Sequence, residues 1–361
     1  MEQQLSIGFY SSSLSKGGLE LNMLRYARYL KNEALRVVIF CVQDSPIHQI
    51  ALQEGFEIVE VKRYKRYWDF GCAIAMKKSI QQQALDWIWF RDPRDMDTLA
   101  WTKLLGSKVK ILYHQGMQMA SPKRSLFHRL RFSQINQWIC LSESLKQQVL
   151  DYTTFPKKKI SILPLALPDD LKSKKYETGE FRALVVGRWD PLKNQHLVIN
   201  AFLILNKRYP QLRLTFIGES TLGESNQYEK DNKKKVRHLD LQDVIQFKPF
   251  QFDLAQTFAD SHLLIIPSIN ETFGMVTIEG MRAGLPLLGS NTGGTKSLIE
   301  GNKCGLTFDP EDAQSLADQW SVLLDNDALR DDLGNHARMA FETHYHIEGQ
   351  MTHWMKILKG K

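Results

Sequence analysis

Short apolar runs rich in β-branched and aromatic residues alternate with amphipathic stretches along the whole chain. Between the first two runs, apolar residues recur at three- and four-residue spacing over 19–30, which predicts a helix with one apolar face. Alternating strands and helices predict βαβ winding and therefore a parallel sheet. Five runs of the first half are typical of buried strands: 5–10, 35–42, 86–90, 109–113 and 137–141.

The same alternation restarts in the second half, after a polar stretch at 166–180 that contains Pro, Gly and Ser and has no clear period. This stretch is expected to be a linker. The pattern predicts an N-terminal wound α/β domain over 1–165, a C-terminal one over 181–340, and a final helix over 341–361 that crosses back to the first domain. The second set of predicted strands is 181–186, 212–217, 244–247, 262–267 and 285–288.

Length and composition agree with this division and exclude several classes of protein. The 361 residues exceed the roughly 250–300 at which a single core stops growing. Hydrophobic residues make up 43% and charged residues 24%, which is typical of globular domains and not of disordered chains. Apolar stretches such as 263–267 are too short to span a bilayer, and no secretory signal is visible. The four cysteines form no CxxC pair, so a cytoplasmic location is expected.

The net charge of +7 comes entirely from the first half of the chain. Up to Pro164 there are 24 basic and 14 acidic residues, against 23 and 26 afterwards. Two segments, 62–68 and 123–132, combine basic and aromatic or apolar residues. They are interpreted either as solvated faces or as sites of acceptor docking or peripheral attachment to an anionic membrane. Nucleic acid is not an expected partner because no nucleic-acid module is recognisable.

A Gly-Gly pair follows the first predicted strand and precedes the first predicted helix. Gly17 and Gly18 allow close approach of a ligand to the backbone, and a helix N-terminus favours phosphate. The pattern is not GxGxxG, and a structural turn explains it equally well. The absence of GxGxxG also disfavours an oxidoreductase.

Two cations follow the first strand of the second half. Gly187 and Arg188 end that strand, and Lys193 opens the next helix. Paired cations at a strand end suit a diphosphate leaving group, because their charge offsets the charge that develops as the bond to phosphate breaks. The alternative is a solvated surface pair.

Two carboxylates flank a helix start in the segment 271–294. Glu271 precedes the helix and Glu279 falls inside it, so they lie at most about 12 Å apart along the axis. That spacing suits hydroxyls at opposite ends of an elongated ligand, while the N–H groups near Phe273, Gly274 and Met275 face a phosphate between them. A nucleotide diphospho-sugar is such a ligand. The alternative is stabilisation of the helix dipole by acidic residues.

These motifs together resemble the retaining GT-B glycosyltransferases of family 4. The segments are KGGLE, VGRWDPLKN and ETFGMVTIEGMRAGLPLLGSNTGG, in the family's order over nearly the whole chain. The resemblance implies two Rossmann-like domains facing across a cleft. It also implies that Arg188 and Lys193 bind the diphosphate, Glu279 the ribose and Glu271 the transferred sugar, with Gly17 and Gly18 approaching the phosphates.

The resemblance further implies a role for His114, which follows a predicted strand at the position where the family's histidine faces the donor sugar. Sugar positioning and transition-state stabilisation are expected of it. Family members of this kind generally lack a protein nucleophile, and the leaving phosphate helps to take the acceptor proton. This chain departs from the family pattern at Lys296 and Ser297, where an acidic residue is usual.

The expected protein is a hexosyltransferase-type enzyme that moves a sugar from a UDP- or GDP-type donor to a glycan or lipid-linked acceptor. Synthesis of bacterial cell-envelope polysaccharide or lipopolysaccharide is the setting that the family suggests. No cofactor is expected and no metal, because Asp95 and Asp97 are interpreted as an N-cap and a first-turn acid rather than a metal-binding DxD. The alternatives are a non-catalytic nucleotide-sugar-binding subunit and a nucleotide-sugar 2-epimerase of the same architecture.

Overall fold

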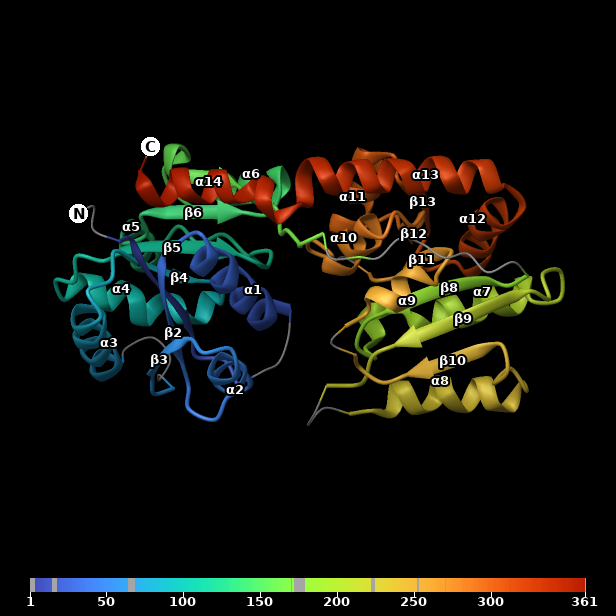
Figure 1. The fold of residues 1–361 in the computed structure, drawn as a ribbon, viewed down its shortest axis with the longest axis horizontal. Helices are drawn as coiled ribbons and strands as arrows, with labels where there is room; N and C mark the ends of the chain where they lie inside the picture. The colour runs from blue at the N-terminus through green and yellow to red at the C-terminus, as the bar shows by residue number, and fades with distance from the viewer. Residues whose placement is uncertain are drawn as a thin grey trace. The chain divides into compact units, whose positions relative to one another are not determined.

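The chain forms two units, each organised around one parallel β-sheet (Figure 1). The N-terminal unit comprises Met1–Pro164 and Met351–Lys361, and the C-terminal unit comprises Leu165–Gln350. The computed structural model describes residues 4–14, 18–63, 69–169, 171, 179–221, 225–251, 253–269 and 271–360.

The N-terminal unit has a seven-stranded sheet with the order β3-β2-β1-β4-β5-β6-β7. The strands are β1 (Ser6–Ser11), β2 (Arg36–Cys41), β3 (Glu57–Glu60), β4 (Trp87–Phe90), β5 (Lys110–Gln115), β6 (Gln137–Cys140) and β7 (Ile160–Ile162). The helices are α1 (Gly18–Asn32), α2 (Pro46–Gln53), α3 (Phe70–Gln82), α4 (Met96–Leu104), α5 (Leu126–Ser133) and α6 (Glu143–Tyr152), with a short 3₁₀ turn η1 (Pro93–Asp95) before α4.

Strand β1 lies in the interior of this sheet, between β2 and β4. Its residue Ile7 pairs in parallel with Val37 of β2 on one side and with Trp87 of β4 on the other. All six residues of β1 are buried, as expected for a parallel strand that helices cover on both faces. The chain therefore winds outward from β1 in both directions.

The C-terminal unit repeats this arrangement with six strands in the order β10-β9-β8-β11-β12-β13. The strands are β8 (Phe181–Val186), β9 (Leu212–Ile217), β10 (Ile245–Lys248), β11 (Leu263–Ile266), β12 (Leu287–Ser290) and β13 (Gly305–Phe308). The helices are α7 (Gln195–Leu205), α8 (Gln227–His238), α9 (Ala255–Ala259), α10 (Met275–Arg282), α11 (Gly293–Asn302), α12 (Ala313–Asp325) and α13 (Asp327–Ala340), with a 3₁₀ turn η3 (Pro191–Lys193) before α7.

The core of the C-terminal unit lies between the sheet and helices α7 and α12. Phe202 of α7 and Trp320 of α12 are fully buried, with ring centroids 6.3 Å apart. Burial of large aromatic side chains of this kind dominates core energetics. The packing fixes the carboxyl end of β8, from which the chain enters the loop before α7.

The last helix, α14 (Ile347–Lys359), supplies core residues to the N-terminal unit. Trp354 is fully buried and lies 5.3 Å from Tyr26 and 5.6 Å from His114, measured between ring centroids. The indole N–H of Trp87 donates a hydrogen bond to the carbonyl of Leu358 at 2.9 Å. The N-terminal unit is therefore completed by residues that follow the C-terminal unit in the chain.

The predicted α/β class with parallel sheets is confirmed, but three strands were not predicted. These are β3, β7 and β13, which are short and half-exposed at the sheet edges, so their apolar pattern is weak. Of the predicted linker, residues 170 and 172–178 lie outside the described residues. Its first residues Ala166 and Leu167 are buried in the C-terminal unit, where the N–H of Leu167 donates to the carbonyl of Tyr345 at 2.9 Å.

Within the described residues, no helix combines the length and the apolar character needed to cross a bilayer.

Replacing Trp354 by Ala is expected to lower the free energy of unfolding of the N-terminal unit by about 3–5 kcal/mol, because a cavity replaces a fully buried aromatic ring. Its exposed neighbour His353 provides the matched control, and His353→Ala is expected to stay within about 0.5 kcal/mol of the wild type. Urea unfolding followed by circular dichroism measures both. Equal stability of the two variants would contradict the assignment of α14 to the core.

Candidate functional site

The predicted donor-side residues gather at the carboxyl ends of β8 and β11. These adjacent strands are the point at which the strand order of the C-terminal sheet reverses. In open α/β sheets ligands bind outside the carboxyl ends of the strands at such a point. The loop after β8 carries Gly187, Arg188 and Lys193, and the loop after β11 carries Glu271.

Arg188 lies in a loop that backbone contacts hold in place. The N–H of Gly187 donates to the carbonyl of Ile217 at 2.9 Å. Gly218 next to it has φ +144°, and a Cβ there would lie 2.1 Å from the carbonyl oxygen of Gly187, so only glycine fits. The Arg188 guanidinium is about half exposed (53%) and its Nη2 lies 3.0 Å from Oδ2 of Asp190. The guanidinium is therefore both oriented and accessible.

Lys193 and Glu271 form an ion pair with 2.5 Å between Nζ and Oε2. The sequence predicted separate partners for them, the diphosphate and the sugar, and did not predict this pair. The two side chains keep 29% and 24% of their surface exposed, so a ligand can reach both. Their loops are also joined through the backbone, because the N–H of Ile269 donates to the carbonyl of Leu192 at 2.8 Å.

Two glycines set the course of the chain around Glu271. Gly274 has φ +78°, and a Cβ there would lie 2.8 Å from Oγ1 of Thr277. Gly294 donates its N–H to the carbonyl of Glu271 at 2.6 Å, and a Cβ on Gly294 would lie 2.4 Å from the carbonyl oxygen of Thr272. The Glu271 loop and the start of α11 are thus packed backbone to backbone.

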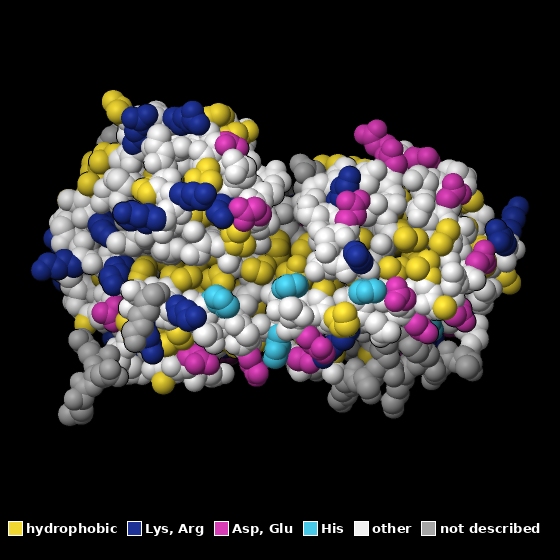
Figure 2. All heavy atoms as spheres, turned by 90° about the horizontal axis from the view of Figure 1, so that it is seen from above, with side chains coloured by type: hydrophobic (Ala, Val, Ile, Leu, Met, Phe, Trp, Pro, Cys, Tyr) yellow, Lys and Arg dark blue, Asp and Glu magenta, His cyan; other side chains and the backbone are white. Residues whose placement is uncertain are grey.

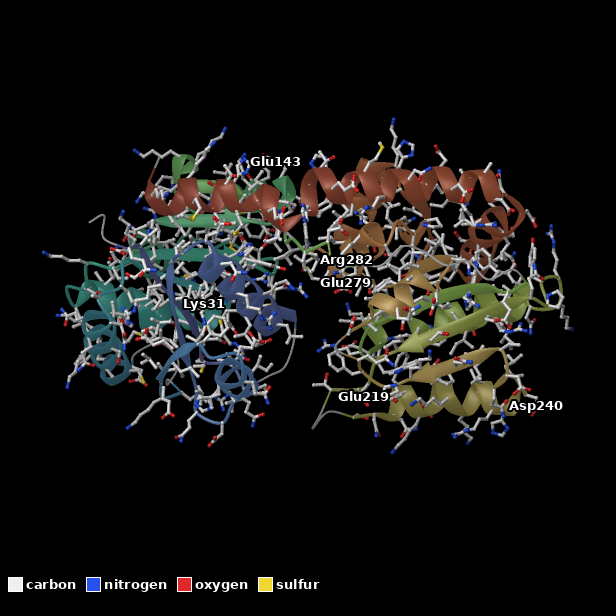
Figure 3. All side chains as sticks on the ribbon, viewed as in Figure 1. Lys31, Glu143, Glu219, Asp240, Glu279 and Arg282 are labelled. Carbon is white, nitrogen blue, oxygen red and sulfur yellow. The ribbon has the colours of Figure 1, made fainter. Side chains whose placement is uncertain are left out.

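Helix α10 begins at Met275, directly after Gly274, and no side chain caps it. The N-terminus of a helix carries partial positive charge and favours an anion. Phe273 is buried and packs edge-on against Tyr345, so only its backbone is available to a ligand. Glu279 lies partly exposed in the interior of α10, one turn before Arg282 (Figure 3).

The structure describes only some of the site residues that were predicted in the N-terminal unit. Gly17 lies outside the described residues, as does Lys16. Gly18 is the first residue of α1 and is exposed, and a Cβ added to it would meet no heavy atom within 4 Å. Both glycines belong to a different unit from the donor-side group.

His114 is fully buried in the N-terminal unit at β5. Its ring lies 5.7 Å from Tyr26, 5.7 Å from Trp89 and 5.6 Å from Trp354, each in an edge-to-face arrangement. Burial, and then the charge of Arg91, lower the pKa of His114 well below its usual value, although the backbone of Leu163 opposes the shift. The imidazole is therefore neutral at neutral pH. A ligand reaches it only if one of the surrounding rings moves.

Asp95 does not cap a helix with its side chain, which corrects the sequence interpretation. It stands at the end of η1 and directly before α4, but its carboxylate instead accepts a 2.5 Å hydrogen bond from the hydroxyl of Ser12, in the loop after β1. Asp97 in the first turn of α4 forms an ion pair with Arg131 at 2.7 Å. Among the described residues, no three His, Cys, Asp or Glu side chains are grouped as a metal site requires.

Sequence reasoning missed several polar residues at these strand ends. Asp190 orients Arg188, and Asn194, at φ 58°, donates its side-chain amide to the carbonyl of Pro310 at 2.8 Å. Arg91 and Asp92 follow β4 directly, and both are buried. Their position directly after a predicted strand could have identified them as candidate site residues. The interpretation instead concentrated on the neighbouring DxD pattern at Asp95 and Asp97.

Two family descriptions match adjoining parts of the chain. "Glycosyltransferase Family 4" matches residues 16–170 and "Glycosyl transferases group 1" matches residues 168–340. The chain belongs to glycosyltransferase family 4. This confirms the resemblance inferred from the motifs.

The curated relatives are similar over part of their length. A D-inositol 3-phosphate glycosyltransferase of Pseudarthrobacter chlorophenolicus is 32% identical over 165 residues, which are 45% of this chain and 38% of that protein. An uncharacterised glycosyltransferase of Haemophilus influenzae is 26% identical over 204 residues, 56% of each. The chain thus covers less than two thirds of these relatives.

Solved structures share the fold over nearly the whole chain. A glycosyltransferase of Rickettsia africae has a TM-score of 0.84 at 17% identity and covers 99% of this chain and 98% of its own. Anabaena HepE, solved with UDP and glucose, has a TM-score of 0.79 at 17% identity and covers 99% and 100%. The predicted GT-B fold class is confirmed.

The buried Asp95 is expected to make stability pH-dependent. Burial raises the pKa of Asp95 to about 7, and the hydrogen bond from Ser12 opposes this only in part. In the unfolded chain an aspartate ionises near pH 3.9. Between about pH 4 and 7 the folded state therefore binds more protons than the unfolded state, so Asp95 reduces stability as pH rises through that window.

Asp95→Asn stays neutral at every pH and should remove this loss. Its melting temperature relative to wild type should rise from pH 5 to pH 8, since each pKa unit is worth about 1.4 kcal/mol. The exposed Asp151→Asn serves as the control and should show no such trend. A constant difference between Asp95→Asn and wild type at all pH values would refute the protonated state of Asp95.

Proposed function

We propose that the chain is a retaining, metal-independent glycosyltransferase of the hexosyltransferase type. It transfers a sugar from a nucleotide diphosphate donor of UDP or GDP type to a hydroxyl of a glycan or lipid-linked acceptor. The observation that carries the proposal is the Lys193–Glu271 pair at the reversal of strand order, beside Arg188 and the uncapped start of α10.

The donor's diphosphate is assigned to Arg188 and Lys193, with the first N–H groups of α10 facing it. When a phosphate takes Lys193 as its counter-ion, the carboxylate of Glu271 is released to accept hydrogen bonds from sugar hydroxyls. Glu279, farther along α10, is assigned to the ribose hydroxyls. The ion pair observed between Lys193 and Glu271 thus keeps both groups satisfied before the donor arrives.

The proposed reaction breaks the bond between the anomeric carbon and the phosphate oxygen and forms a bond from that carbon to the acceptor oxygen on the same face. The acceptor's proton passes to the leaving phosphate, and the nucleoside diphosphate departs. Arg188 and Lys193 stabilise the negative charge that develops on the leaving group. The neutral imidazole of His114 is assigned to positioning the sugar, through one N–H donor and one acceptor nitrogen.

The solved relatives support the donor class and the biological setting. HepE has been solved with UDP, with UDP and glucose, and with UDP-glucose. WaaG, a glycosyltransferase involved in lipopolysaccharide biosynthesis, has a TM-score of 0.66 at 16% identity and covers 94% of this chain and 95% of its own. We propose cell-envelope polysaccharide or lipopolysaccharide assembly, at the cytoplasmic face of the membrane, as the role of this chain.

Removal of either donor-side cation should weaken nucleotide binding. Arg188→Ala and Lys193→Ala are each expected to reduce affinity for UDP or GDP about tenfold or more, because a charge-assisted contact to phosphate is lost. Glu271→Ala should keep nucleotide binding but cut donor turnover by a hundredfold or more. Calorimetric titration with each nucleotide and a donor-hydrolysis assay in EDTA separate the two effects.

The exposed Lys234→Ala on α8 changes charge by the same amount and should leave both measurements unchanged. Nucleotide binding without transfer to any acceptor would favour a binding subunit. Interconversion of the donor sugar would favour a 2-epimerase. No binding of any nucleotide would refute the donor site.

We also propose that helix α5 makes a peripheral contact with an anionic membrane. Leu126 and Leu130 lie one turn apart on this helix and are 81% and 42% exposed, and Arg124 and Arg129 beside them are exposed as well. Arg131 is not available, because it pairs with Asp97. On the face shown in Figure 2, Lys and Arg side chains gather over the N-terminal unit. Apolar residues flanked by cations are typical of interfacial helices.

Vesicle flotation tests this contact. The wild type should float with vesicles that contain anionic lipid and not with neutral ones, and the double variant Leu126→Glu/Leu130→Glu should reduce the bound fraction about tenfold. The matched control is Leu52→Glu/Ile74→Glu, since both side chains are 58% exposed on other helices of the same unit. Equal flotation of the two double variants, or none by the wild type, would exclude α5 as the contact.

A further inference from the structure

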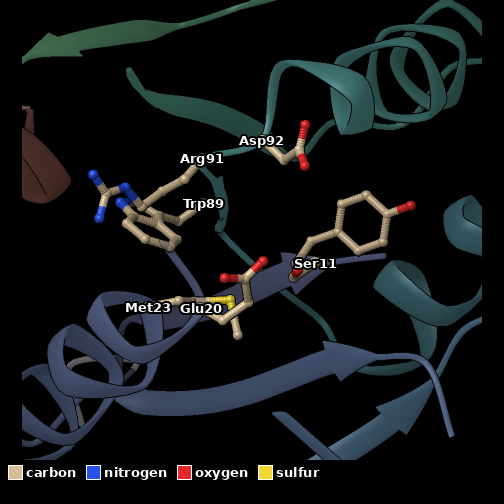
Figure 4. A pocket seen from close by; sticks show the side chains of 7 residues that line it. Ser11, Glu20, Met23, Trp89, Arg91 and Asp92 are labelled. Atoms are coloured by element: carbon tan, nitrogen blue, oxygen red, sulfur yellow. The ribbon is translucent and has the colours of Figure 1, made fainter. Parts of the chain in front are cut away.

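A small pocket in the N-terminal unit lies at the ends of β1 and β4. Ser11 and Trp89 come from these strands, Glu20 and Met23 from α1, and Arg91 and Asp92 from the loop after β4 (Figure 4). The adjacent strands β1 and β4 are the point at which the strand order of this sheet reverses. The pocket therefore has the position of a ligand site in an open α/β sheet, and neither the family descriptions nor the motifs assign it a ligand.

Arg91 lines this pocket as a buried, incompletely bonded cation. The residue is 4% exposed, and its Nε and Nη1 atoms have no hydrogen-bond partner among the described residues. Burial lowers the pKa of Arg91 to about 10, which leaves it charged at neutral pH. A buried charge whose donors are unpaired costs stability. The charge of Glu20 on the same pocket opposes this cost but does not pair Nε and Nη1, so these two donors lack a compensating interaction. A bound anion supplies that interaction, because the guanidinium fork matches a carboxylate or phosphate.

The other pocket residues restrict what carries the anion. Trp89 has an indole N–H that is likewise buried without a partner in the described part of the chain. Glu20 and Asp92 are carboxylates on the same pocket, and Asp92 already binds Arg94 at 2.6 Å. Carboxylates repel a bare anion but accept hydrogen bonds from hydroxyls. The combination suits an anionic group attached to a polyhydroxylated body.

The pocket is also connected to the proposed reaction centre. Trp89 lines the pocket with its ring 5.7 Å from that of His114, and the charge of Arg91 acts on the His114 imidazole. Both residues belong to the N-terminal unit, whereas the donor-side group lies in the C-terminal unit. Because the diphosphate is assigned to residues of the C-terminal unit, the acceptor is the reactant to consider for this pocket.

We propose that this pocket binds the anionic group of the acceptor, a carboxylate or phosphate carried on a sugar, through the guanidinium of Arg91 and the indole N–H of Trp89. The body of the sugar stays outside, near Glu20 and Asp92, because the pocket is small. This inference deepens the proposed function, and it rests on that function only in identifying the ligand as the acceptor. Arg91 is thus a specificity residue that selects acid or phosphorylated acceptors over neutral ones.

Ligand-observed NMR titrations of the full chain test the proposal with four probes: glucuronate, glucose 6-phosphate, inorganic phosphate and neutral glucose. The wild type should bind at least one of the two anionic sugars ten times more tightly than glucose, and Arg91→Gln should lose that preference. Arg28→Gln removes the same charge from the exposed face of α1, and it should behave as wild type. Tighter binding of glucuronate would indicate a carboxylate site, and tighter binding of glucose 6-phosphate would indicate a phosphate site.

Three results would overturn the proposal. They are equal binding of glucose and both anionic sugars by the wild type, unchanged preference in Arg91→Gln, and inorganic phosphate binding as tightly as the preferred anionic sugar. Displacement of the anionic sugar by UDP would place the anion in the donor site and overturn it as well. Failure of the wild type to bind any nucleotide would instead count against the donor site and leave the Arg91 result standing.

The melting temperature shows whether Arg91→Gln still folds. Because Arg91 is buried and incompletely bonded, Arg91→Gln should melt at or above the wild-type temperature without ligand. The preferred anionic sugar should raise the melting temperature of the wild type and not that of Arg91→Gln. A large fall in the melting temperature of Arg91→Gln would show that Arg91 holds the fold and would contradict the proposal.

Discussion

Parallel pairing of β1 with β4, and of β8 with β11, determines where both units place their polar groups. Each of these pairs brings together two strands whose following helices lie on opposite sides of the sheet, so the loops after them diverge. Side chains in the diverging loops need not fill the core. In the C-terminal unit the loops carry Arg188, Lys193 and Glu271, and in the N-terminal unit they carry Ser12, Arg91 and Asp92.

Much of the fold follows from the sequence because buried parallel strands are continuous apolar runs. The predicted strands 181–186 and 212–217 coincide with β8 and β9, in which most residues are apolar and buried. The edge strands β3, β7 and β13 could not be predicted in this way. Their polar and half-exposed residues follow no strict alternation, and they are strands only because a neighbour supplies hydrogen bonds.

The sequence also predicted which residues form the donor-side group, but it did not predict how they contact one another. Strand ends and glycines marked Arg188, Lys193 and Glu271 as candidates. Their contacts depend on two loops 78 residues apart in the chain, and only the folded structure shows that Lys193 and Glu271 satisfy each other. Asp95 shows the opposite error: its local sequence is that of a helix cap, but its carboxylate accepts a hydrogen bond from Ser12, in the loop after the neighbouring strand β1.

Helix α14 has a consequence for how the protein is made. Residues 1–164 of the N-terminal unit are synthesised first, but Trp354 and Leu358, which contact Tyr26, His114 and Trp87, follow the whole C-terminal unit in the chain. Domains generally fold during synthesis in chain order. Here the aromatic packing around His114 is incomplete until α14 has been synthesised, so the N-terminal unit can be completed only after the whole C-terminal unit.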